Sequence, residues 1–65
     1  MTLFVNGKAC EHEAATVADL VHILALPAAT LLIEHNGTAL RRDEWPSARL
    51  TTGDKLEILR IAAGG

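Results

Sequence analysis

The stretch that decides the fold is residues 2–24, TLFVNGKACEHEAATVADLVHIL. It opens with four apolar or β-branched residues, 2–5, which are typical of a strand. Asn6-Gly7 follows, and this dipeptide is a strong hairpin signal because both central residues of the tight turn need a positive φ. Residues 8–13 are then the expected return strand. The chain is therefore predicted to begin with a β-hairpin.

The end of the same stretch predicts a short amphipathic helix near residues 17–25. The Thr16 hydroxyl can accept a hydrogen bond from an early backbone N–H, and Asp19 can reach back to the Thr16 backbone. Pro27 forbids much continuation. Four apolar residues recur with the spacing of one helix face: Val17, Leu20, Val21 and Leu24.

Working outward, the sequence predicts three further strands, at residues 30–34, 38–40 and 55–58. Asn36-Gly37 is a second hairpin signal, residues 42–46 suggest a tight turn or a single helical turn, and a turn at residues 52–54 precedes the last strand. The element order is typical of an α+β protein of the β-grasp (ubiquitin-like) type, with a mixed sheet of four to five strands and one crossing helix. The strand residues expected in the core are Leu3, Val5, Ile33, Leu56 and Ile58.

Composition narrows the class of function. The chain has 65 residues, of which 49% are hydrophobic, so we expect a single domain whose core is too small to enclose an elaborate catalytic cavity. The net charge is −2, and six scattered Lys and Arg residues with two aromatic residues argue against nucleic acid as a partner. One cysteine and the lack of an apolar run near about 20 residues indicate the cytoplasm and no membrane span.

The second half of the chain resembles the ThiS family of sulfur carriers in thiamin biosynthesis. Four segments carry the resemblance, in this order and spacing: residues 33–37 (IEHNG), 42–45 (RDEW), 53–58 (GDKLEI) and 64–65 (GG). The resemblance covers nearly the whole chain, more loosely at the front. Ala62-Ala63 departs from the larger residues that family members often carry, which affects the expected subsite preferences of a partner.

The resemblance implies a protein co-substrate rather than an enzyme, with no bound cofactor and no metal. A ThiF-like adenylyltransferase uses ATP to activate the carboxylate of Gly65 as an acyl-adenylate. A sulfur donor, such as the persulfide of a cysteine desulfurase, converts it to a thiocarboxylate, and a ThiG-like thiazole synthase receives the sulfur. The expected architecture is a domain over residues 1–61 and a flexible tail over residues 62–65, in which Gly64 has no side chain to obstruct threading into the partner.

A docking surface is expected on the outer face of the sheet. If Leu56 and Ile58 face the core, strand alternation places Leu59 and Ile61 on the opposite face. The same alternation in the first strand directs Phe4 outward. We therefore predict that Phe4, Leu59 and Ile61 contribute to partner docking, with Phe4 and Leu59 in one apolar patch on neighbouring strands.

Other side chains allow weaker interpretations. Cys10 could hold a persulfide, but a small half-buried strand residue is favoured. The spacing of His12, His22 and His35 matches no zinc pattern. Three alternative functions stay open. The first is a sister sulfur carrier for molybdopterin, cysteine or another sulfur-containing metabolite. The second is a ubiquitin-like modifier that becomes attached to lysines of other proteins, and the third is a binding-only β-grasp domain.

Overall fold

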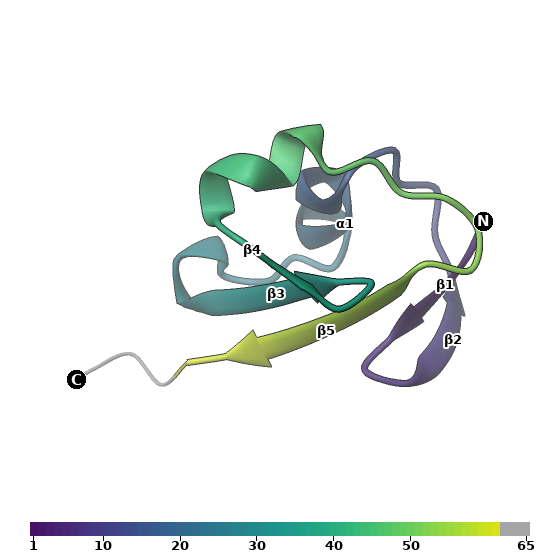
Figure 1. The fold of residues 1–65 in the computed structure, drawn as a ribbon, viewed down its shortest axis with the longest axis horizontal. Helices are drawn as coiled ribbons and strands as arrows, with labels where there is room; N and C mark the ends of the chain where they lie inside the picture. Colours follow the sequence, from purple (N-terminus) through teal and green to yellow (C-terminus); the bar gives the residue numbers. More distant parts are fainter. Residues whose placement is uncertain (62–65) are drawn as a thin grey trace.

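The computed structural model describes residues 1–61, and the chain path is shown in Figure 1. The described elements, in chain order, are β1 (Thr2–Val5), β2 (Lys8–Glu11), α1 (Val17–Ile23), the 3-10 helix η1 (Ala28–Thr30), β3 (Leu31–His35), β4 (Thr38–Leu40), the 3-10 helix η2 (Arg42–Ser47) and β5 (Lys55–Arg60). Within the described residues, no helix is long and apolar enough to cross a membrane.

The five strands form one mixed sheet in the order β2-β1-β5-β3-β4. The central pair, β1 and β5, is parallel, whereas β1–β2, β3–β4 and β3–β5 are antiparallel. Helix α1 and η2 lie on the same side of the sheet, as Figure 1 shows. This arrangement confirms the predicted α+β class and the β-grasp fold. It leaves the opposite side of the sheet, here called the outer face, uncovered by any described helix.

Both predicted hairpin turns are present, and each uses the left-handed backbone that the sequence indicated. The φ angles are 51° at Asn6 and 82° at Gly7, and 50° at Asn36 and 85° at Gly37. Asn6 also holds the centre of the sheet together. Its side-chain oxygen accepts from the backbone N–H of Ile58 at 2.7 Å, and its amide donates to the Ile58 carbonyl at 3.1 Å. The side chain thus continues the β1–β5 ladder where β1 turns away.

Helix α1 begins as predicted but ends earlier. The Thr16 hydroxyl accepts from the Asp19 backbone N–H and the Asp19 carboxylate accepts from the Thr16 N–H, each at 3.2 Å, which completes a capping box. The helix stops at Ile23 rather than near residue 25 because Ala25 adopts a φ of +55°. The N–H groups of residues 25 and 26 donate to the carbonyls of residues 22 and 21, the Schellman pattern of a helix end. The return strand is also shorter than predicted, ending at Glu11 rather than at residue 13.

The core lies between the sheet and α1 with η2. Eleven apolar residues are buried in it: Leu3, Ala14, Val17, Leu20, Val21, Leu31, Ile33, Trp45, Leu50, Leu56 and Ile58. Seven of the nine residues predicted for the core are in this set, and the other two, Val5 and Leu24, are partly buried and pack against it. Trp45, the last residue of the 42–45 segment that carries the family resemblance, is only 4% exposed. These contacts fix β5 at the centre of the sheet.

A polar cluster fastens the turn before β5 to the end of β3. The Asp54 carboxylate lies 2.8 Å from His35 Nε2 and accepts from the Thr51 backbone N–H at 3.0 Å. It also accepts from the Thr51 hydroxyl at 3.0 Å and from the Asn36 amide at 3.2 Å. Partial burial acts to raise the pKa of Asp54, but these hydrogen bonds together outweigh it and lower the pKa from 3.8 to about 2.

This cluster makes the stability of the domain sensitive to acid. Because the folded-state pKa of Asp54 lies below the unfolded value, the stabilisation is complete above the unfolded pKa of 3.8 and is lost as the pH falls through about 2. Asp54→Ala should therefore lower the free energy of unfolding at neutral pH by about 2 kcal/mol and flatten its acid dependence. Urea unfolding at a series of pH values measures both effects. Asp43→Ala, which removes an exposed ion pair with Arg41, is the control, and equal pH profiles for the two variants would contradict the assignment.

Candidate functional site

Strand β5 is the last described element before the tail predicted for residues 62–65. It lies between β1 and β3, and the last backbone hydrogen bond that holds its end runs from the Ile61 N–H to the Thr30 carbonyl at 2.7 Å. The tail predicted for residues 62–65 follows directly. Gly64 and Gly65, the residues predicted for threading and for sulfur attachment, lie outside the described residues, and so does the predicted boundary after residue 61.

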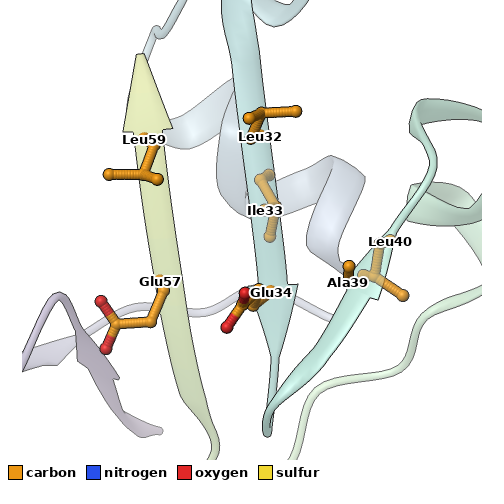
Figure 2. Close-up of a pocket in the computed structure, with 7 residues that line it drawn as sticks. All are labelled: Leu32, Ile33, Glu34, Ala39, Leu40, Glu57 and Leu59. Atoms are coloured by element: carbon orange, nitrogen blue, oxygen red, sulfur yellow. The ribbon is translucent and has the colours of Figure 1, made fainter. Parts of the chain in front are cut away.

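The outer face carries an apolar hollow over the half of the sheet that leads to the tail. Leu32 on β3 and Leu59 on β5 are directly opposite each other in the strand register. Their exposed fractions are 53% and 64%, large for leucine, and Figure 2 shows both side chains on the same side of the sheet. Ala39 and Leu40 of β4 and the carboxylates Glu34 and Glu57 also line the hollow. Exposed apolar side chains grouped in this way are typical of a protein-binding surface.

The structure separates Phe4 from the other two predicted docking residues. Leu59 lies in the hollow, and Ile61 is 50% exposed just beyond the end of β5. Phe4 is only partly exposed and lies in a second hollow with Gly7, Lys55 and Glu57. In the register of β1 with β5, Phe4 is opposite Lys55, four residues before Leu59, or roughly 13 Å along the strand. The side chain adjacent to Leu59 is therefore Leu32 rather than Phe4.

Sequence reasoning missed Leu32, although a signal for it exists. Residues 31–33 are all aliphatic, and a strand that buries Leu31 and Ile33 must direct the residue between them to the other face. The exposure of Leu32 is therefore a consequence of the same alternation that identified Leu59. Alternation does not predict which exposed residues become neighbours, because that depends on the register between strands.

The reactive side chains of residues 1–61 do not gather into a metal site. No three His, Cys, Asp or Glu side chains within this part of the chain come together as ligands. Cys10 is a half-buried free cysteine on β2 whose Sγ lies 3.6 Å from the Leu3 carbonyl oxygen. His35 is engaged with Asp54, as described above.

The fold and this surface define a class: a small ubiquitin-like β-grasp protein with an exposed apolar hollow on the outer face of its sheet. The chain belongs to the ThiS family, whose family model matches residues 3–65. Membership makes it a small sulfur carrier protein and not a catalyst.

Solved structures agree with the family assignment. The chain is similar to the crystal structure of the thiamine biosynthesis protein ThiS from Geobacter metallireducens, with 32% identity, a TM-score of 0.83 and complete coverage of both chains. A solution NMR structure of a thiamine biosynthesis protein from the same organism gives 32% identity and a TM-score of 0.81 over 100% of this chain and 88% of that chain. Comparison with curated proteins gave no match.

Proposed function

We propose that this protein carries sulfur for thiamine biosynthesis as a thiocarboxylate on Gly65. The observation that supports this most strongly is the ThiS family match, which extends through Gly64 and Gly65. The thiamine assignment of the similar Geobacter metallireducens structures favours this pathway over the sister carriers. The domain supplies recognition, and the chemistry takes place on the backbone carboxylate of the last glycine.

The proposed chemistry has two steps. The Gly65 carboxylate attacks the α-phosphorus of ATP in a ThiF-like adenylyltransferase, which gives an acyl-adenylate and releases pyrophosphate. Sulfide then attacks the acyl carbon and AMP leaves, which gives the thiocarboxylate. If the donor is a cysteine desulfurase persulfide, the same attack gives an acyl disulfide, and a thiol must reduce it before a ThiG-like thiazole synthase can receive the sulfur.

The outer face contributes to this function as the surface on which the adenylyltransferase recognises the carrier. Leu32 and Leu59 expose apolar area on the half of the sheet from which residue 62 continues. A partner that docks there is positioned to receive the tail at the same time. Burial of the body offsets the entropy lost when the tail is ordered in the partner, about 1–2 kcal/mol per residue.

Binding to the cognate adenylyltransferase tests this role. Leu59→Ala and Leu32→Ala should each weaken binding by about 1–2 kcal/mol while leaving the domain folded, because both side chains are more than half exposed. Ile23→Ala is a matched control, since Ile23 is a 46% exposed aliphatic residue on α1 rather than on the sheet. Phe4→Ala and Ile61→Ala test the sequence-based docking prediction in the same titration. Wild-type affinity for both leucine variants would show that the partner docks elsewhere.

Pyrophosphate exchange tests the proposed activation. The cognate adenylyltransferase should exchange radioactive pyrophosphate into ATP only when this protein is present. If exchange occurs but the protein then becomes attached to lysines of other proteins, the ubiquitin-like modifier alternative is correct. No exchange with the wild-type chain would contradict the carrier function.

A further inference from the structure

Two glutamates of the outer face form a like-charged pair across the sheet. Glu34 on β3 and Glu57 on β5 are directly opposite each other in the antiparallel register, and both are exposed. Side chains in this relation have Cβ atoms about 4.5–5.5 Å apart, and like charges there destabilise a sheet. Figure 2 shows both side chains beside the hollow that contains Leu32 and Leu59, two residues along each strand from that leucine pair.

Within residues 1–61, no close ion pair offsets this repulsion. Among the ion pairs of residues 1–61, none involves Glu34 or Glu57. The nearby cation on the same face of β5 is Lys55, two residues before Glu57, and it makes no ion pair with that carboxylate in the described structure. The two carboxylates are therefore exposed, opposite in register and without an ion-pair partner among the described residues.

We propose that Glu34 and Glu57, with Leu32 and Leu59 beside them, receive an arginine or lysine of the adenylyltransferase that is flanked by an apolar side chain. This inference rests on the proposed function and names the chemistry of the surface that the carrier recognises. A cation between the two carboxylates removes their mutual repulsion and gains attraction from both. The adjacent leucines contact the apolar side chain that flanks the cation. The site therefore recognises a cation together with an apolar side chain rather than charge alone.

The same pair argues against a second copy of this chain as the occupant. A two-fold symmetric contact through the outer face brings each patch against itself, so four carboxylates would meet around the leucines. Opposite charge on a different protein resolves the repulsion, whereas self-association increases it. The net charge of −2 gives a cationic partner a further advantage through electrostatic steering.

The test compares stability and binding in one double variant, E34Q/E57Q. Relief of the repulsion should leave the free protein as stable as wild type or more stable in urea unfolding. Binding to the cognate adenylyltransferase should nevertheless weaken by about tenfold at low ionic strength, and the difference should shrink at high salt. The matched control, E13Q/D43N, removes the same charge from exposed positions outside the outer face and should bind within about twofold of wild type.

The outcomes separate the possibilities. Weaker binding of E34Q/E57Q together with undiminished stability supports the site, because a merely structural role would lower both. Equally weakened binding of the two double variants would mean that only net charge matters and would overturn the proposed site. Wild-type binding affinity of E34Q/E57Q would overturn it as well. A salt-stabilised dimer of the free protein that L59A abolishes would also overturn it, in favour of a second copy. Wild-type protein that neither binds the enzyme nor supports pyrophosphate exchange would overturn the proposed function itself.

Discussion

Deletion of Gly65 is expected to abolish adenylation of the protein while leaving the domain folded. Among residues 1–61 the buried core lies within residues 3–58, and a glycine has no side chain to add to it. The deletion moves the carboxylate to Gly64, about 3.3–3.6 Å short of its required position, which is far outside the alignment that acyl transfer tolerates. Pyrophosphate exchange with the cognate adenylyltransferase should fall to the background measured without carrier.

Two further tail variants make the test specific. One additional residue after Gly65 should block activation as completely as the deletion, because it moves the carboxylate past the nucleotide. Gly64→Leu should block it by adding a side chain to a segment proposed to enter a narrow channel. All three variants should unfold in urea with the wild-type midpoint, and exchange by the deletion variant at the wild-type rate would contradict the role of Gly65.

Leu56→Ala is expected to have the largest effect on stability. Leu56 is fully buried on β5, the central strand, and belongs to the apolar cluster that joins the sheet to α1. Truncation of a buried leucine costs about 2–5 kcal/mol through lost burial and the cavity that remains. A domain of this size without disulfides or metals usually has only about 3–5 kcal/mol of net stability, so a loss in the middle of that range removes most of it.

The control for this prediction lies on the same strand. Leu59→Ala removes the same atoms from a side chain that is 64% exposed, and its free energy of unfolding should change by less than about 0.5 kcal/mol. Far-ultraviolet circular dichroism during urea unfolding compares the two variants directly. Equal losses of stability in both would mean that β5 does not bury its Leu56 face.

The order of elements was predictable because the local signals were strong. Asn6-Gly7 and Asn36-Gly37 supply the positive φ values of two tight turns, and Thr16 with Asp19 supplies both halves of a capping box. Alternation also identified which side chains of β5 enter the core. The end of α1 was harder to predict from the sequence. The residue with the left-handed backbone there is Ala25, and alanine lacks the helix-end signal that glycine gives.

The site required strand register, which no local pattern contains. Phe4 and Leu59 are both on the outer face of neighbouring strands, yet the parallel pairing of β1 with β5 separates them along the sheet. The pairing of β3 with β5 brings Leu32 to Leu59, and it also brings Glu34 to Glu57. These pairs join residues about 25 positions apart in sequence, and they arise only when the whole sheet is assembled.

The measurement that tests the carrier function most directly is the intact mass of the protein after incubation with ATP, the cognate adenylyltransferase and sulfide. We expect a mass increase that corresponds to one sulfur in place of one oxygen. The increase should depend on ATP, and fragmentation should locate it at Gly65. The Gly65 deletion variant should keep its original mass under the same conditions. A wild-type protein that is adenylated but gains no sulfur, or a deletion variant that does gain sulfur, would contradict the proposed function.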